Sequence, residues 1–211
     1  MTYRVSPRQL RVYAIVDPRD VDMNPRELAG AIFRAGVPII QLRAKGATDD
    51  ELRVWSADFA VAAVEHDALF VVNDRVDIAL EVGADGVHLG PNDMSIAQAR
   101  ERSADLIIGG SAGDVRRARK LVEQGVDYLG CGAIWNATAS KENASEARGL
   151  EMIREISSAV SVPIVGIGGV TLERAPRVRK AGAAGVAVIR AIAGQPDPGV
   201  AAAAFVEVMT R

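Results

Sequence analysis

The sequence predicts one domain of the α/β class, a closed (β/α)8 TIM barrel that spans residues 1–211. Short apolar runs rich in β-branched residues alternate with longer helical patterns along the whole chain. Eight such pairs can be counted, and a short glycine-containing motif recurs between a helix and the next strand. No linker or shift in composition divides the chain, so a single domain is expected.

The expected strands include nearly continuous apolar runs, as is typical of parallel strands that are buried on both faces. They are Val12–Val16, Pro38–Leu42, Leu69–Val72, Gly86–His88, Leu106–Ile108, Tyr128–Gly130, Ile164–Gly166 and Gly185–Val188. A doubly wound open sheet is the alternative architecture. Eight repeated units favour closure into a barrel instead.

Helical patterns fill the intervals between these strands. They are Pro25–Ala35, Asp49–Glu65, Arg75–Val82, Ser95–Arg102, Val115–Gln124, Leu150–Ala159, Leu172–Lys180 and Pro198–Met209. Four of them are followed by a glycine suited to a left-handed helix end: Gly36, Gly83, Gly125 and Gly182. In such barrels the active site lies where the strands end, so polar residues that follow strands are the functional candidates.

Composition excludes several classes of function. A net charge of −2 and 4% aromatic residues argue against a nucleic-acid-binding surface. One cysteine, Cys131, rules out an internal disulfide and fits a cytoplasmic protein, and with two histidines it makes a structural zinc site unexpected. No signal peptide or membrane-spanning run is recognised.

Cationic and acidic residues follow the second, third and fourth expected strands. Gln41, Arg43 and Lys45 alternate, so an extended segment would place them on one side, where they suit an anionic ligand. Asp74 and Asp93 follow the next two strands and could instead be helix N-caps, although Ser95 is a better cap for its helix. Two carboxylates beside two cations match a Mg²⁺ site that also binds a substrate phosphate.

His88 could be a general base, but a hydrogen-bonded structural role is favoured for a histidine at a strand end. Gly109-Gly-Ser111 is expected to be a small loop whose hydroxyl approaches a phosphate, or an ordinary turn. His66 is expected on the surface at a helix end, and Cys131 in the core rather than as a nucleophile.

Two further segments are suited to a second anion. The long polar stretch from Ala133 to Gly149 contains Thr138, Ser140 and Lys141, and is either a binding loop or a tolerated insertion. The glycines of Gly166-Ile-Gly-Gly169 and the backbone after Gly185–Val188 correspond to the usual phosphate site of such barrels. The sequence thus predicts two phosphorylated ligands facing each other at one end of the barrel.

With these motifs in order, the chain resembles the thiamine phosphate synthase family over nearly its whole length. The matching pieces are Tyr13-Ala-Ile-Val-Asp17, Gln41-x-Arg43-x-Lys45, Asn73-Asp74, Gly86-Val-His-Leu-Gly90 with Asp93, Asp127-Tyr-Leu-Gly130, Thr138-x-Ser140-Lys141 and Ile167-Gly-Gly-Val170. The resemblance implies a cytoplasmic transferase whose partners are a pyrimidine diphosphate and a thiazole phosphate, with Mg²⁺ as cofactor. It leaves a homo-oligomer open.

The resemblance also implies roles for individual residues. Asp74 and Asp93 would bind Mg²⁺, and Arg43, Lys45 and Lys141 would be catalytic. The pyrimidine diphosphate would contact Gln41, Leu42, Arg43, Ala44, Lys45, Asn73, Ser111 and Lys141. The thiazole phosphate would contact Thr138, Ala139, Ser140, Gly169, Ile189 and Arg190.

The implied chemistry needs no protein nucleophile. Diphosphate leaves the pyrimidine methylene, the resulting cation is stabilised by the aminopyrimidine ring, and the thiazole nitrogen attacks it. Ala133, Ser140 and Arg190 depart from the family pattern, and Arg190 could either contact the thiazole phosphate or point into solvent. The alternative functions are a thiazole phosphate isomerase and a non-catalytic barrel that binds phosphorylated metabolites.

Overall fold

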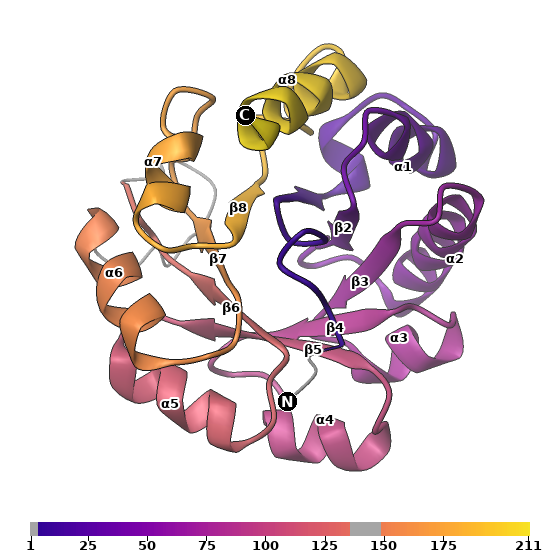
Figure 1. Cartoon of the computed structure of the whole chain (residues 1–211). Helices are drawn as coiled ribbons and strands as arrows, with labels where there is room; N and C mark the ends of the chain where they lie inside the picture. Colours follow the sequence, from indigo (N-terminus) through magenta and orange to yellow (C-terminus); the bar gives the residue numbers. More distant parts are fainter. Residues whose placement is uncertain (1–3, 136–148) are drawn as a thin grey trace.

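The computed structural model describes residues 4–135 and 149–211. Its eight strands are all parallel and close into a barrel in sequence order, and the helices form a ring outside them (Figure 1). The predicted (β/α)8 fold is therefore confirmed, and the open doubly wound sheet is excluded.

The elements follow the sequence in strict alternation. The strands are β1 (Val12–Val16), β2 (Ile39–Leu42), β3 (Leu69–Asn73), β4 (Gly86–Leu89), β5 (Ile107–Ala112), β6 (Tyr128–Cys131), β7 (Ile164–Ile167) and β8 (Gly185–Val188). The helices are α1 (Pro25–Arg34), α2 (Asp49–Glu65), α3 (Val76–Glu81), α4 (Ile96–Arg102), α5 (Val115–Glu123), α6 (Gly149–Ala159), α7 (Ala175–Lys180) and α8 (Pro198–Thr210), with a short 3-10 helix η1 at Pro18–Asp20.

Helix boundaries have local causes in the sequence. Asn24 caps α1, while Thr48 and Ser95 start α2 and α4 with reciprocal capping boxes to Glu51 and Gln98. The four glycines expected at helix ends, Gly36, Gly83, Gly125 and Gly182, all have positive φ, from 68° to 106°. These glycines therefore end their helices as predicted.

One end of the barrel is closed by the N-terminal segment. Val5 and Leu10 are buried and pack with the interior side chains Tyr13, Ile39 and Tyr128. Figure 1 shows this indigo segment crossing the centre of the ring. Since the backbone N–H of Val186, at the start of β8, donates to the carbonyl of Arg11, the segment covers the end where strands begin. Ligand access is therefore left to the opposite end, called the barrel mouth below.

Two predicted boundaries differ from the structure by more than one residue. The fifth strand continues to Ala112, so Gly109-Gly-Ser111 lies in a strand paired with β6 and is not a loop. The seventh helix begins at Ala175 rather than Leu172 because Pro176 is best accommodated in the first helical turn, and residues 172–174 form a turn before it.

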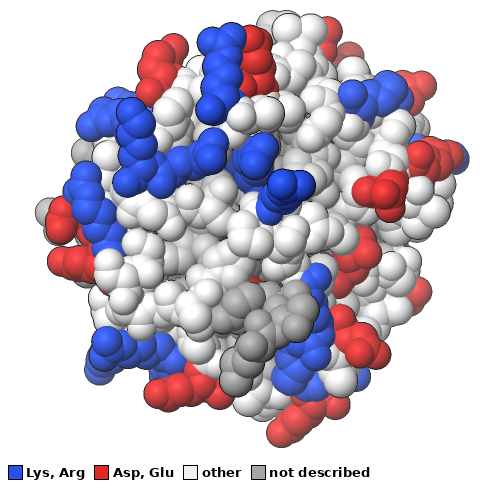
Figure 2. Space-filling view, viewed as in Figure 1, with Lys and Arg blue, Asp and Glu red and all other residues white. Residues whose placement is uncertain are grey.

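The surface carries mixed charge. On the face in Figure 2, basic side chains gather over α7, whose last turn holds Arg177, Arg179 and Lys180, and acidic side chains lie around the rim.

Within residues 4–135 and 149–211, no helix combines the length and apolar character needed to cross a bilayer.

Candidate active site

The strand ends bring the predicted residues of β2, β3 and β4 to one side of the barrel mouth. In the sheet register Leu42 lies beside Val72, and Asn73 lies beside His88. Asp74 follows directly, and its backbone N–H donates to the carbonyl of His88 over 3.0 Å. The third and fourth strand ends are thus joined at the point where the metal site was predicted.

The segment after β2 presents its side chains in two directions. Gln41 is buried, and its Nε2 donates to the hydroxyl of Tyr13 inside the barrel over 3.1 Å. Leu42 packs in the outer core between strands and helices, so its side chain does not face the barrel interior. Arg43 is half-buried and Lys45 is exposed, while Ala44 between them is buried.

Asp74 occupies an unusual position just beyond β3. Its φ is +57°, in the left-handed region that aspartate tolerates better than most residues. Asn73 Nδ2 donates to Asp74 Oδ2 over 2.8 Å. The N-cap of α3 is Arg75, and no side chain caps that helix, so the helix-cap interpretation of Asp74 is wrong.

The charge environment of Asp74 links the predicted site residues. Burial raises the pKa of the Asp74 carboxyl, and the nearby carboxylate of Asp93 raises it further. The positive charges of Lys45, Arg75 and Arg43 oppose this rise. The structure therefore brings Arg43, Lys45 and Asp93 into electrostatic reach of Asp74.

Asp93 is also not a helix cap. Its Oδ2 accepts a hydrogen bond of 2.6 Å from the backbone N–H of Gly90, while Ser95 caps α4 as expected. Two carboxylates held near each other repel unless a cation lies between them. No group of three or more potential metal-binding side chains occurs in the described ranges. Mg²⁺ commonly uses only one or two carboxylates with substrate phosphate and water, so the Asp74–Asp93 pair fits it.

Ser111 lies on β5 and faces the barrel interior. Its Oγ is 2.9 Å from His88 Nε2, and His88 Nδ1 is 3.2 Å from the Tyr128 hydroxyl. The structural interpretation of His88 is therefore supported. Gly109 is required by packing rather than by a phosphate, because a Cβ there would lie 2.1 Å from Tyr128 Cζ.

On the opposite side, the end of β7 is built from glycine. Gly168 and Gly169 have φ values of +101° and +64°. The backbone N–H of Trp135 donates to the Gly168 carbonyl, and a Cβ on Gly169 would lie 2.8 Å from Trp135 Cβ. Glycine is therefore needed here for both backbone conformation and close approach.

The segment after β8 supplies the other two predicted residues on this side. Ile189 is half-buried and Arg190 is exposed, and the Arg190 carbonyl accepts from Gln195 Nε2 over 3.0 Å. Thr138, Ala139, Ser140 and Lys141 fall outside the described residues, so their predicted roles have no structural counterpart here.

Cys131 and His66 have the non-catalytic surroundings expected from the sequence. Cys131 is fully buried in the outer core, and burial raises the pKa of its thiol to about 12, which argues against a thiolate nucleophile. His66 caps the C-terminal end of α2, half-buried beside the ring of Phe33.

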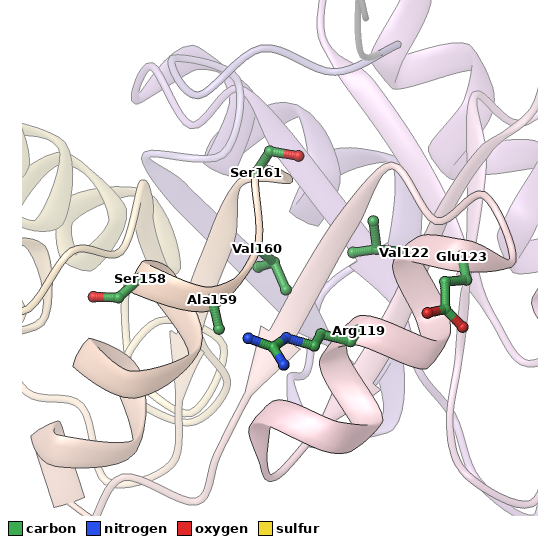
Figure 3. A pocket seen from close by; sticks show the side chains of 7 residues that line it. All are labelled: Arg119, Val122, Glu123, Ser158, Ala159, Val160 and Ser161. Carbon is green, nitrogen blue, oxygen red and sulfur yellow. The ribbon is translucent and has the colours of Figure 1, made fainter.

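Two surface pockets lie outside the barrel interior. Figure 3 shows the first, where α5 and α6 end: Arg119 and Glu123 come from α5, and Ser158 and Ala159 come from α6. These helix ends lead into β6 and β7, so this pocket is at the end of the barrel away from the strand termini. The second pocket opens beside the barrel mouth between the start of α4 and α5, and its lining includes Asp93, Arg117 and Lys120.

Sequence reasoning did not predict the contacts of Tyr13 and Tyr128 with Gln41 and His88. Both are buried, and their hydroxyls lie 2.7 Å apart in the barrel interior beside Gln41 and His88. Gly109 was the available signal for these contacts. It pairs in register with Tyr128, and its missing side chain leaves room for a large neighbour.

Comparison with known proteins gives a consistent result. The family model described as thiamine monophosphate synthase matches residues 12–192. The thiamine-phosphate synthase of Archaeoglobus fulgidus is 44% identical over 202 residues, covering 96% of this chain and 94% of the relative. That of Chlorobium phaeovibrioides is 41% identical over 191 residues, covering 90% and 91%.

A solved structure extends this similarity to three dimensions. The thiamine phosphate pyrophosphorylase from Pyrococcus furiosus superposes with a TM-score of 0.87 at 36% identity, and the match covers 97% of each chain. The family model spans most of the barrel, and the relatives match nearly end to end. The chain belongs to the thiamine monophosphate synthase family.

Proposed function

We propose that this chain is a thiamine phosphate synthase, a transferase with two phosphorylated substrates. It joins 4-amino-2-methyl-5-(diphosphomethyl)pyrimidine to 4-methyl-5-(2-phosphoethyl)thiazole and releases diphosphate. The observation that carries this proposal is the grouping of Arg43, Lys45, Asp74 and Asp93 at one side of the barrel mouth. A diphosphate leaving group needs this combination of cations and metal-binding carboxylates.

The pyrimidine diphosphate is assigned to the β2–β5 side. The positive charges of Arg43 and Lys45, which act on Asp74, would offset the negative charge of a departing diphosphate. Asp74 and Asp93 would bind Mg²⁺, which supplies further positive charge to that leaving group. Gln41, Asn73 and Ser111 offer amide and hydroxyl groups, and Leu42 and Ala44 offer backbone groups. Lys141 is assigned to the same diphosphate.

The thiazole phosphate is assigned to the β7–β8 side. Gly169 keeps the backbone free of side chains there, and Ile189 and Arg190 follow β8. Backbone N–H groups at such a point favour a phosphate without a cationic side chain. Thr138, Ala139 and Ser140 are assigned to this substrate as well.

Catalysis then consists of positioning and charge stabilisation. The pyrimidine C–O bond breaks, the diphosphate takes the electron pair, and the thiazole nitrogen donates its lone pair to the methylene carbon. No proton transfer by a side chain is needed, which agrees with the burial of Cys131 and with the hydrogen bonds of His88.

A product assay tests this proposal directly. The protein is incubated with both substrates and Mg²⁺, and thiamine phosphate and diphosphate are measured together. Omitting either substrate provides the control. We expect equal amounts of the two products only when both substrates are present. Conversion of the thiazole phosphate alone would favour the isomerase, and binding without turnover would favour the non-catalytic barrel.

The cell compartment and assembly complete the proposal. Both substrates are small, charged metabolites, and the sequence has a single buried cysteine, so we assign the enzyme to the cytoplasm. Whether copies associate is measured by light scattering, and a homo-oligomer is compatible with the proposed chemistry.

A further inference from the structure

A chain of polar side chains crosses the interior of the barrel. Gln41 Nε2 donates to the hydroxyl of Tyr13 over 3.1 Å, and the Tyr13 and Tyr128 hydroxyl oxygens are 2.7 Å apart. The Tyr128 hydroxyl is 3.2 Å from His88 Nδ1, and His88 Nε2 is 2.9 Å from Ser111 Oγ. The chain thus connects two predicted substrate-binding residues, one at each end.

The fold makes room for this chain. A Cβ on Gly109 would lie 2.1 Å from Tyr128 Cζ and 2.6 Å from His88 Nδ1. A Cβ on Gly130 would lie 3.0 Å from His88 Cε1. The neighbouring strands β5 and β6 therefore each have a glycine beside the rings of Tyr128 and His88. An apolar layer that includes Ile39 packs around the tyrosines.

The hydrogen bonds of the chain have a defined direction. An amide nitrogen can only donate, so the Tyr13 oxygen accepts from Gln41. The buried Tyr13 proton then goes to the Tyr128 oxygen, its other partner among the described residues. Tyr128 in turn donates to His88 Nδ1. Burial raises the pKa of both tyrosines, so both hydroxyls keep their protons.

This direction fixes the protonation of the histidine. When Nδ1 accepts from Tyr128, a neutral His88 ring carries its proton on Nε2, and that N–H donates to Ser111 Oγ. The serine oxygen is then an acceptor within the chain, so its own proton remains for another acceptor. At the other end, Gln41 Oε1 takes no part in the chain and remains an acceptor for a ligand N–H.

We propose that Tyr13, Tyr128 and His88 are positioning residues, whose one-way hydrogen bonds hold Gln41 as an acceptor and Ser111 as a donor for the pyrimidine diphosphate. This inference rests on the proposed function. A ligand with an amino group at one end and a diphosphate at the other needs an acceptor and a donor in this arrangement. The three residues act on the substrate only through Gln41 and Ser111.

Steady-state kinetics test the effect on the substrate. Tyr128→Phe removes the central link, so we expect the kcat/KM for pyrimidine diphosphate to fall about ten-fold or more, while the KM for thiazole phosphate stays within about two-fold. Tyr13→Phe breaks the contact to Gln41 and leaves the link from Tyr128 to Ser111 in place, so it should also lower this kcat/KM. Ile39→Val is the matched control, because it removes a methyl group from the same interior layer without a hydrogen bond.

The histidine tautomer gives a readout that does not depend on activity. The protein has two histidines, so ¹⁵N spectra of the imidazole rings contain signals from His66 and His88 alone. The His66→Gln variant assigns these signals. In the wild-type protein at neutral to alkaline pH we expect His88 to be protonated on Nε2 and bare on Nδ1. Tyr128→Phe should convert it to a mixture of tautomers.

Three results would overturn the inference: a His88 proton on Nδ1 in the wild type, an unchanged tautomer in Tyr128→Phe, or kinetics in which Tyr128→Phe matches Ile39→Val for both substrates. If Tyr128→Phe does not fold, the wild-type spectrum and Tyr13→Phe still decide. Failure of the proposed function would appear as no turnover by the wild type, and the tautomer measurement would stand separately.

Discussion

On the β2–β5 side of the barrel mouth the candidate ligand groups are mainly side chains, whereas on the β7–β8 side they are mainly backbone. Arg43, Lys45, Asp74 and Asp93 form a charged group on the first side. On the second, Gly168 and Gly169 hold the backbone in conformations that other residues avoid. A side-chain site should be sensitive to loss of a charge, and a backbone site to addition of a methyl group.

The largest effect is expected from a charge removed on the β2–β5 side. Asp74→Asn should lower kcat by roughly 100- to 1,000-fold, or about 2.7–4.1 kcal/mol in barrier, because one of the two proposed Mg²⁺ ligands is lost. The KM for thiazole phosphate should hardly change. Asp77→Asn is the control, since Asp77 pairs with Arg75 on the surface and has no assigned role at the site. Near-wild-type turnover by Asp74→Asn would contradict the metal assignment.

Asp74→Asn should make the metal-free protein more stable, although it lowers activity. Burial and Asp93 raise the pKa of Asp74 in the folded protein, so its protonated form is favoured by folding. The contribution of protonated Asp74 to the free energy of unfolding is fully present below the pKa that this carboxyl has in the unfolded chain. It is lost as the pH rises through the higher pKa of the folded protein. At neutral pH with a chelator, Asp74→Asn should therefore raise the midpoint of urea unfolding. A lower midpoint would show that the carboxylate stabilises the metal-free fold.

The next effect concerns the glycine that makes room for the buried chain. Gly109→Ala places a methyl group 2.1 Å from Tyr128 Cζ, so overpacking should destabilise the protein by roughly 2–3 kcal/mol. Gly113→Ala lies just beyond β5 with nothing within 4 Å of its added Cβ, and should change stability by no more than about 0.5 kcal/mol. Urea unfolding of the two variants measures the difference. Equal stabilities would mean that Tyr128 moves without cost.

On the β7–β8 side, Gly169→Ala tests the backbone site. Gly169 and Gly83 both have positive φ, but only Gly169 also approaches Trp135 closely. Both alanine variants should lose roughly 1 kcal/mol of stability for the backbone conformation. Gly169→Ala alone should raise the KM for thiazole phosphate, by about ten-fold or more, while the KM for pyrimidine diphosphate stays unchanged. A similar rise in Gly83→Ala would remove the argument for a local effect.

The smallest effect is expected from Arg190. Its side chain is exposed beside the assigned thiazole phosphate site, and a charge-assisted contact there would be broken in Arg190→Ser. We expect the KM for thiazole phosphate to rise about ten-fold at most, equivalent to roughly 1.4 kcal/mol. Kinetics with each substrate varied in turn measure it. Unchanged constants for both substrates would assign Arg190 to the surface.

The fold was predictable because its signals are local. A glycine after a helix and an apolar run of strand length are both recognised from a few consecutive residues. Gly36 and Gly83, for example, end their helices as expected. The error at Gly109–Ser111 has a non-local cause. Two consecutive glycines are typical of a turn, so the sequence alone favoured a loop there. In the structure Tyr128, on the next strand, occupies the space of the missing Gly109 side chain.

The site was predictable to a different degree on its two sides. Placing residues after strands was enough to group Asp74 with Asp93, because parallel strand ends meet at one end of a barrel. The link from Gln41 to Ser111 was not predictable, since it depends on side-chain directions across the barrel interior. The assigned residues between 138 and 141 stay predictions.

Calorimetric binding of inorganic diphosphate tests the division of the barrel mouth most directly. Titrations are made with and without Mg²⁺ into the wild type, Asp74→Asn and Gly169→Ala. The predicted result is binding that requires Mg²⁺, is lost in Asp74→Asn and is retained in Gly169→Ala. Diphosphate binding of equal strength without Mg²⁺, or its loss in Gly169→Ala with retention in Asp74→Asn, would contradict the account.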